Sequence, residues 1–303
     1  MDYIVLLLGL LLLVFSADYF VEGASAVAKN LGVSSLLIGL TIVGLGTSAP
    51  EILVALMASL QGNAGLAIGN ALGSNMANIG LILGGTALVA PLAFHTQLLK
   101  RELPVLLLIT FFCYYLAWDG LSVADGLLML AVLLLFLFWL IQSALHDKQS
   151  LEQEKSEQSY STMRATIYLL VGLIGLLVSS KLLVWAAVNI AQALGVSDLV
   201  IGLTVVALGT SLPELAAAIS SVLKGQDDLA VGNVIGSNVY NLLAVYAMPA
   251  LIAPGVVEES VLQRDFPILI GFTCVLFLFG WSRKSQGVIN RWEGVGLLLV
   301  YLY

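Results

Sequence analysis

One stretch of this sequence occurs twice. Residues 39–51 read GLTIVGLGTSAPE and residues 202–214 read GLTVVALGTSLPE. Shifting the chain by 163 positions aligns residues 39–78 with 202–241 without a gap, and by direct count 21 of these 40 positions are identical. A repeat of this length constrains the fold more than any local pattern, because both copies must adopt the same local structure. We therefore expect two structurally equivalent halves.

Composition indicates a membrane protein. Hydrophobic residues make up 60% of the chain and charged residues 10%, which excludes an ordinary soluble domain. Apolar runs of roughly 20 residues, the length that crosses a bilayer core, recur along the sequence. They predict an all-α polytopic protein with ten spans, at residues 3–28, 34–60, 65–90, 102–117, 121–145, 164–193, 198–223, 229–252, 264–281 and 288–303.

The apolar runs at the two ends of the chain differ in what they predict. The N-terminus is apolar almost from the start and has no basic leader, so we expect a first span and not a removed signal peptide. The last apolar run, 288–303, corresponds to about 24 Å of helix, less than the roughly 30 Å hydrocarbon core. We expect either a tilted, incomplete span or a natural chain that continues beyond Tyr303.

The long polar segment 146–163 separates the two copies. It is too short for a folded domain and is rich in charged residues, which predicts a solvated linker that moderate shortening would not harm. The expected organisation is a five-helix repeat over 1–145, a cytoplasmic linker over 146–163 and a second five-helix repeat over 164–303.

The cations predict the orientation of the chain. With the N-terminus outside, ten of the twelve lysines and arginines fall in inner loops and only Arg264 in an outer one, while Lys181 lies within a span. This is a strong positive-inside bias. Scattered cations and a formal charge of −7 give no indication of nucleic-acid binding. Because each half has five spans, the second half must be inverted, as in many secondary transporters. We expect residence in a prokaryotic inner membrane.

The repeated motif places a carboxylate, hydroxyls and a helix breaker inside an apolar run. Pro50 lacks an amide hydrogen and clashes with the carbonyl of Gly46, so it should break the span and free carbonyl oxygens. Thr47 and Glu51 are four residues apart and share a helical face. Buried carboxylates in a membrane are costly and usually mark ion or proton pathways. The motif therefore predicts an ion site, formed twice.

A second polar pattern follows each motif. Asn70, Ser74 and Asn78 recur every four residues, and Asn233, Ser237 and Asn241 repeat them. These oxygen donors suit sodium, calcium or magnesium and not zinc or copper. We expect ligand roles at the serines and at the last asparagine of each stripe. For Asn70, Asn75, Asn233 and Asn238, interhelical packing is an equal alternative.

Other polar residues have weaker interpretations. Ser48 and Glu51, like Ser211 and Glu214, also fit a capping box, which would only start a helix. Asp18 and Lys181 occupy equivalent positions in the two copies; Asp18 and Glu22 are expected to face a cytoplasmic vestibule and Lys181 to extend outward. Cys113 and Cys274 lie in separate apolar runs and should pack as small hydrophobes. His95 and His146 receive no role.

The doubled motif resembles the alpha repeats of the sodium/calcium exchanger branch of the calcium/cation antiporter superfamily. Gly-Thr-Ser-x-Pro-Glu followed by Gly-Asn-x-x-Gly-Ser-Asn-x-x-Asn occurs once per half, and the resemblance covers nearly the whole chain. It implies two inverted five-helix repeats around a diamond of four ion sites. The implied ligands are Thr47, Ser48, Glu51, Ser74, Asn78, Thr210, Ser211, Glu214, Ser237 and Asn241, with the carbonyls of Gly44 and Ala207 at the outer sodium sites.

The resemblance also implies the function. We expect a secondary antiporter that exchanges Na⁺ for Ca²⁺ by alternating access, electrogenically if three sodium ions replace one calcium, with no cofactor and no enzymatic activity. Several relatives carry an aspartate where Asn241 stands, and potassium-dependent relatives have an acid there. The neutral Asn241 therefore argues against potassium dependence. A Ca²⁺/H⁺ antiporter is the alternative, because a buried glutamate can also carry a proton. A cation channel would use the same oxygens without a counter-ion, and an intramembrane hydrolase would use two carboxylates as acid and base.

Overall fold

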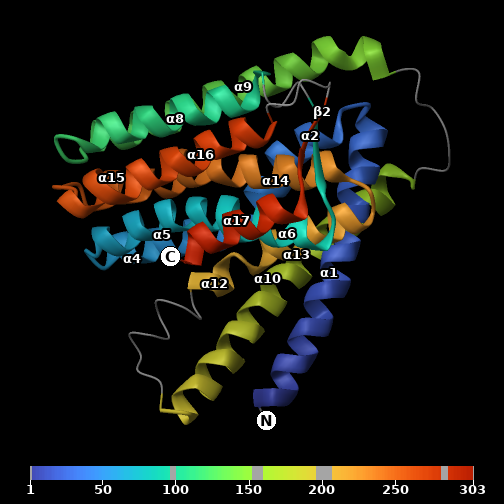
Figure 1. Cartoon of the computed structure of the whole chain (residues 1–303), viewed down its shortest axis with the longest axis horizontal. Coiled ribbons are helices and arrows are strands. Elements are labelled where there is room, and N and C mark those ends of the chain that lie inside the picture. The colour runs from blue at the N-terminus through green and yellow to red at the C-terminus, as the bar shows by residue number, and fades with distance from the viewer. Residues whose placement is uncertain (1, 96–99, 152–159, 196–206, 281–285, 303) are drawn as a thin grey trace.

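The computed structural model describes residues 2–95, 100–151, 160–195, 207–280 and 286–302, and these residues are almost entirely helical (Figure 1). The first half contains α1 (Asp2–Leu31), α2 (Ser35–Ile38), η1 (Gly39–Val43), α3 (Gly44–Thr47), α4 (Ala49–Leu60), α5 (Ala64–Ala77), η2 (Asn78–Leu83), α6 (Gly84–Val89), α8 (Glu102–Ala117) and α9 (Val123–Leu151), where η marks a π-helical segment.

The second half repeats this order. It contains α10 (Thr162–Ala193), α12 (Ala207–Thr210), α13 (Leu212–Leu223), α14 (Asp227–Tyr240), η4 (Asn241–Val245), α15 (Ala247–Ile252), η5 (Val261–Asp265), α16 (Phe266–Gly280) and α17 (Arg291–Leu302). Of the described helices, six are long and apolar enough to cross a membrane, or seven if the bent pair of Ser35–Thr47 and Ala49–Leu60 forms one span. The helical membrane-protein fold expected from the sequence is confirmed.

Two boundaries differ from the expected spans, and one strand was not expected. Helix α9 continues to Leu151, several residues into the expected linker. The tenth span was expected to begin at residue 288, which is wrong, because Gln286–Ile289 form strand β2 and α17 begins at Arg291. Strand β1 (Leu92–His95) was not predicted either; it pairs antiparallel with β2, with Leu92 opposite Ile289.

The β1–β2 ribbon joins the connectors of the two halves. Leu92 and Ile289, which face each other across the two strands, are fully buried. The backbone N–H of Ala93 donates to Asp227 Oδ2 at 3.1 Å. The ribbon therefore replaces the first turn of the tenth helix with a backbone pairing between two loops, which ties the connector after α6 to the connector before α17.

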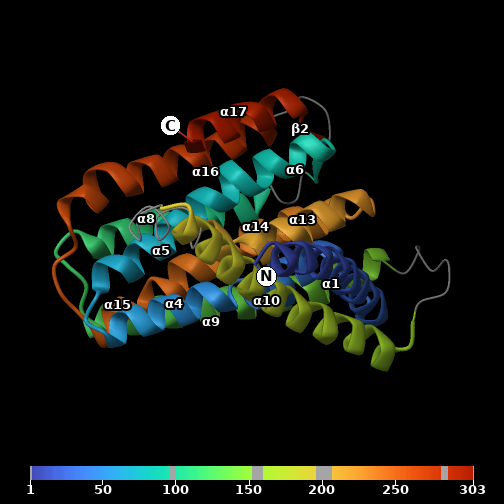
Figure 2. The same cartoon turned by 90° about the horizontal axis from the view of Figure 1, so that it is seen from below.

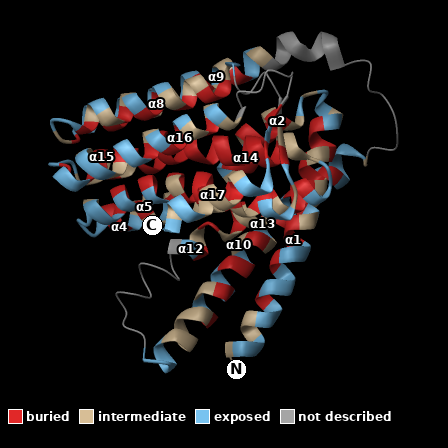
Figure 3. Cartoon of the chain, in the orientation of Figure 1, coloured by how far each residue is buried: buried red, intermediate tan, exposed pale blue. Residues whose placement is uncertain are grey.

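Helices α1 and α10 form a crossing pair that extends away from the other helices (Figures 1 and 2). Their backbones approach at glycines: a Cβ on Gly23 would lie 2.3 Å from the backbone N of Leu169, and one on Gly172 would lie 2.3 Å from the backbone N of Phe20. Only glycine permits this approach. Burial is concentrated in α14, while the N-terminal part of α1 is largely exposed (Figure 3).

Candidate ion-binding site

Both copies of the motif break the helix at the serine. Helix α3 ends at Thr47, Ser48 has φ −78° and ψ 1°, and α4 begins at Ala49 with a 43° bend between the two segments. Ser211, at φ −90° and ψ 4°, separates α12 from α13 in the same way. The proline in the first turn of each following helix explains the break. The break predicted from Pro50 is confirmed.

The serines do not cap the helices that they precede. Within the described chain neither Ser48 nor Ser211 makes a side-chain capping hydrogen bond, and the buried Ser48 Oγ has no hydrogen-bond partner there at all. The capping-box alternative therefore does not hold at these positions. The hydroxyl of Ser48 is left with unused acceptor capacity inside the protein.

The two glutamates lie together at the centre of the molecule. Glu51 and Glu214 each expose only 1% of their surface, and their side chains interact electrostatically with one another. The interactions cross between the repeats, because Glu51 interacts with Thr210 and Glu214 with Thr47. In each glutamate Oε2 has no hydrogen-bond partner among the described residues. Two adjacent buried carboxylates are costly unless cations or protons balance them.

The Thr47 hydroxyl lies at a junction of oxygen atoms. Its Oγ1 is 3.1 Å from the carbonyl of Val43, 3.0 Å from Asn233 Oδ1 and 3.3 Å from Ser237 Oγ. Ser237 Oγ in turn donates to the carbonyl of Gly44 at 3.4 Å. One hydroxyl proton cannot satisfy all these acceptors at once. The cluster therefore concentrates oxygen lone pairs between α3 and α14.

The asparagines connect the two halves. Asn78 Nδ2 donates to Asn238 Oδ1 at 3.0 Å, and Asn70 Nδ2 donates to the backbone carbonyl of Glu51 at 3.0 Å. Asn241 Oδ1 and both side-chain polar atoms of Asn75 are buried and have no partner in the described part of the chain. Asn70, Asn233 and Asn238 thus hold neighbouring site residues through hydrogen bonds, in agreement with the packing alternative for them.

The remaining predicted site residues lie on α5 and at the break between α12 and α13. Ser74 and Ser211 are buried, and Thr210 is half-buried. The Gly209 carbonyl, next to Thr210, accepts a hydrogen bond from Ser180 Oγ of α10 at 2.6 Å. Ala207 begins α12, and its side chain is outside the described part of the structure.

Two features of the site were not predicted from the sequence. A π-helical segment begins at Asn78 and another at Asn241, so the helix changes its winding at the end of each polar stripe. Such segments are frequent at functional sites. The glycines of the second stripe also bring α14 against the first motif: a Cβ on Gly236 would lie 2.5 Å from the carbonyl oxygen of Leu40. The glycine spacing was the available signal for this contact.

The donor set defines the chemistry of the site. It consists of carboxylate, hydroxyl, amide and carbonyl oxygens, which bind hard cations such as Na⁺ and Ca²⁺. The described residues contain no group of three or more histidines, cysteines or acidic residues that could hold a metal ion. The arrangement suits a small number of hard cations held by two carboxylates and neutral oxygens.

Comparisons with known proteins agree with this chemistry. A family model described as "Sodium/calcium exchanger protein" matches residues 1–142 and 164–303. The sodium/calcium exchanger MaX1 of Methanosarcina acetivorans is 34% identical over 99% of this chain and 96% of its own. The inner membrane protein YrbG of Escherichia coli is 40% identical over 97% of this chain and 92% of its own.

Solved structures match equally well. The sodium-calcium exchanger NCX_Mj, in crystals soaked with Na⁺ and Sr²⁺, is 35% identical and superposes with a TM-score of 0.86 over 99% of this chain and 96% of that chain. The same exchanger soaked without Na⁺ and Ca²⁺ also gives a TM-score of 0.86. The likeness therefore extends over the whole described fold.

Proposed function

Because this chain belongs to the sodium/calcium exchanger family, we propose that it exchanges Na⁺ for Ca²⁺ across a membrane by alternating access. The family is one of transporters, and cation antiport is the activity common to it. The coupling ion and the electrogenic mode are the finer parts of this proposal. Escherichia coli YrbG is named an inner membrane protein, which supports the same location here.

The pair of Glu51 and Glu214 is the observation that carries the proposal. The two carboxylates are 1% exposed, interact with one another and come from opposite repeats. One Ca²⁺ would balance both charges, and the six to eight oxygens that Ca²⁺ prefers can come from the surrounding hydroxyl, amide and carbonyl groups. A site with two carboxylates from two repeats also suits transport, because a relative movement of the repeats changes its exposure.

We assign the ligands from the residues around this pair. Thr47, Ser48, Ser74 and Asn78 would complete the site from the first repeat, and the carbonyl of Gly44 would serve a flanking sodium ion. From the second repeat the corresponding groups are those of Thr210, Ser211, Ser237, Asn241 and the Ala207 carbonyl. The unpartnered oxygens of Ser48 and Asn241 support their assignment, because buried polar atoms normally have a partner.

Charge balance gives the expected electrical behaviour. Three Na⁺ bound with two carboxylates leave one positive charge, whereas one Ca²⁺ leaves none. Exchange of three Na⁺ for one Ca²⁺ would therefore move net charge. We propose the orientation that follows from the cations of the sequence, with the N-terminus outside and the connector between α9 and α10 in the cytoplasm.

The decisive experiment measures ⁴⁵Ca²⁺ flux in everted membrane vesicles, with Na⁺ and H⁺ gradients imposed separately. Sodium-driven flux that responds to membrane potential is the expected result. Flux driven by a proton gradient alone would assign the Ca²⁺/H⁺ alternative. Calcium flux that needs no counter-ion on the opposite side would indicate a channel. Vesicles that carry Glu51→Gln serve as the control for leak.

A further inference from the structure

Asp18 joins the α1–α10 pair to α13. Ser220 Oγ donates to Asp18 Oδ1 at 2.6 Å, and Lys224 Nζ lies 3.6 Å from the same oxygen and donates to the Asp18 backbone carbonyl at 3.2 Å. Asp18 is in the middle of α1, whereas Ser220 is in the last turn of α13 and Lys224 directly follows it. We name these three residues the Asp18 clamp.

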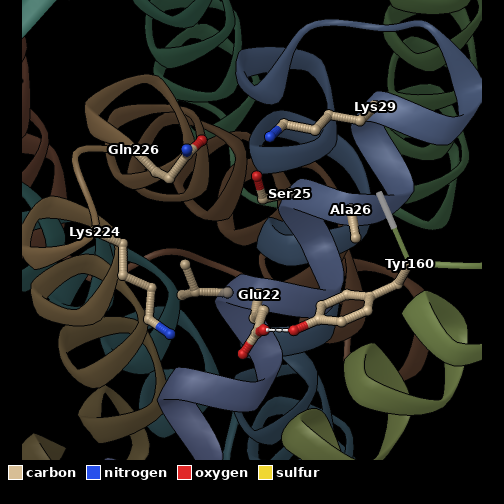
Figure 4. Close-up of a pocket in the computed structure, with 8 residues that line it drawn as sticks. Glu22, Ser25, Ala26, Lys29, Tyr160, Lys224 and Gln226 are labelled. Atoms are coloured by element: carbon tan, nitrogen blue, oxygen red, sulfur yellow. Dashed lines mark hydrogen bonds between the residues drawn. The ribbon is translucent and has the colours of Figure 1, made fainter. Parts of the chain in front are cut away.

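The clamp closes an apolar seam. Beneath it Ala17 and Val21 of α1 are buried in one cluster with Ala217 of α13. Beside it Glu22, Lys29, Tyr160, Lys224 and Gln226 line a cavity of about 160 Å³ (Figure 4). Figure 4 shows Lys224 extending from the end of α13 toward α1. The clamp therefore adjoins this cavity, which Tyr160 of the α9–α10 connector also lines, so it lies on the connector side of the molecule.

The internal repeat provides a built-in comparison for this seam. At the 163-residue offset, Asp18 corresponds to Lys181, Ser220 to Met57 and Lys224 to Gln61. Lys181 and Met57 are exposed, and Lys181 makes no ion pair with any described residue. Among the described residues, α10 and α4 share no interface comparable to that of α1 and α13. One seam is packed and clamped, and its counterpart is neither.

In an inverted repeat this difference has an energetic consequence. The two faces of such a protein open alternately when equivalent seams exchange their packing. The state in which α10 closes on α4 would bring Lys181 toward Met57 and Gln61, which offer no opposite charge. In that state the contact of Asp18 with Ser220 and Lys224 would be lost, and Lys181 would form no equivalent ion pair with Met57 or Gln61. The state seen here, with α1 closed on α13, is therefore favoured by the chemistry of the clamp.

Resting on the alternating-access function above, we propose that Asp18, Ser220 and Lys224 set which face of the exchanger opens at rest, by holding α1–α10 against α13 on the connector side. They are positioning residues for transport and do not touch the ions. A hydrogen-bonded, partly exposed ion pair is expected to shift the equilibrium between the two faces by about three- to tenfold.

The first test compares ion affinity on the two faces. The apparent affinity of each face scales with the fraction of molecules open to it, so the ratio of Ca²⁺ half-saturation on the connector side to that on the opposite side reports the equilibrium. Asp18→Asn should lower this ratio about three- to tenfold, and Lys224→Gln should also lower it. Lys181→Gln, at the counterpart position, should leave the ratio unchanged. Asp18→Glu keeps the carboxylate, so its ratio should stay close to that of the wild type.

The mirror-image test adds a contact to the other seam. Gln61→Glu places a carboxylate where Lys181 can reach it only when α10 closes on α4. This contact favours the state that is open on the connector side, so the ratio should fall. A ratio that rises or stays level would contradict the symmetry argument. An unchanged ratio in Asp18→Asn, or an equal effect of Lys181→Gln, would overturn the clamp.

An ion-independent measurement separates this proposal from the proposed function. Ala217→Cys, in a chain with Cys274→Ala, places a thiol in the seam where Ala217 is fully buried. A membrane-impermeant thiol reagent added on the connector side should label it slowly, and Asp18→Asn should accelerate labelling by the same factor. Faster labelling of Asp18→Asn in a protein that shows no Ca²⁺ flux would support the clamp proposal and reject Ca²⁺ as the transported ion. Normal flux with unchanged labelling and an unchanged ratio would reject the clamp alone.

Discussion

The centres of the two repeats match, whereas their outer helices differ. At the centre Glu51 faces Glu214, and each interacts with the threonine of the other repeat. Away from the centre, α1 carries Asp18 and Glu22 where α10 carries Lys181 and Trp185. Asp18 is bonded to α13 and Glu22 accepts a hydrogen bond from Tyr160, whereas Lys181 and Trp185 are exposed.

The difference indicates two kinds of constraint on a duplicated transporter. An ion held between two repeats needs ligands from both, so the centre must keep its chemistry in each copy. The outer helices meet different partners, because α1 packs against α13 and bonds Tyr160, whereas α10 shares no comparable interface with α4 among the described residues. Substitutions of equivalent ion ligands should therefore have equal effects, and substitutions at equivalent outer positions unequal ones.

The largest effect is expected at the two glutamates. Glu51→Gln and Glu214→Gln should each abolish calcium exchange in folded protein, because one carboxylate cannot balance Ca²⁺ in a dry site. Vesicle flux and size-exclusion behaviour are the measurements. Glu102→Gln is the matched control, since Glu102 is also a buried carboxylate but lies at the start of α8. Wild-type flux in either central variant would reject the two-carboxylate site.

The next effect concerns packing. Gly236→Ala would place a Cβ 2.5 Å from the Leu40 carbonyl oxygen, so α14 and the first motif must separate, at a cost of about 1–3 kcal/mol. Gly271→Ala in α16 is the control, because Gly271 is exposed and a Cβ there meets no described atom within 4 Å. Gly271→Ala should therefore be tolerated. Thermal unfolding in detergent measures both variants, and equal losses would mean that the Leu40 contact does not limit the approach of α14.

The central features were predictable because they depend on residue type. Pro50 and Pro213 break the helix by covalent geometry, and a glutamate twice in an apolar run has few explanations other than an ion site. The π-helical segments at Asn78 and Asn241 were not predictable. Each has only five or six residues, almost all apolar, and such a short run has the same hydrophobic pattern in an α-helix and in a π-helix.

The peripheral features were missed because they depend on distant partners. The β1–β2 strands have four residues each, too few for a recognisable alternation, and they pair across almost two hundred residues. The Asp18 clamp joins residues 202 positions apart. Nothing near Asp18 in the sequence distinguishes a seam contact from the vestibule that was expected there.

A third prediction tests whether the asparagines at the ends of the stripes face the ions. Asn241→Asp adds a third carboxylate beside two, and like charges in a dry site cannot all stay ionised without taking up a proton or a further cation. Exchange should become more sensitive to acid or to potassium, and Asn78→Asp should act similarly. Sodium-driven flux against pH, with and without K⁺, is the measurement. An unchanged profile in both variants would restrict the site to the two motif segments.

The smallest effect is expected where the connector meets α1. Tyr160 hydroxyl donates to Glu22 Oε1, and Asn30 Nδ2 donates to the Tyr160 carbonyl at 3.0 Å. Arg164 lies over the Tyr160 ring, 4.3 Å from its centroid. The expectation of a dispensable connector over 146–163 therefore needs refinement. Removing part of residues 152–159 should preserve exchange, whereas Tyr160→Ala should lower thermal stability and Tyr160→Phe should lower it less.

The pH dependence of this contact follows from its charges. The hydrogen bond to Glu22, and then the negative charge of that carboxylate, raise the pKa of Tyr160 above its usual value of 10. A group whose pKa is raised on folding contributes stability below its unfolded value and loses it as the pH passes the folded value. The contact should therefore be constant from about pH 6 to pH 9 and weaken only at higher pH. Tyr160→Phe and wild type should differ by a constant, small interval in unfolding temperature over that range. Convergence of the two curves below pH 9 would mean that the Tyr160 hydroxyl makes no hydrogen bond to Glu22 in solution.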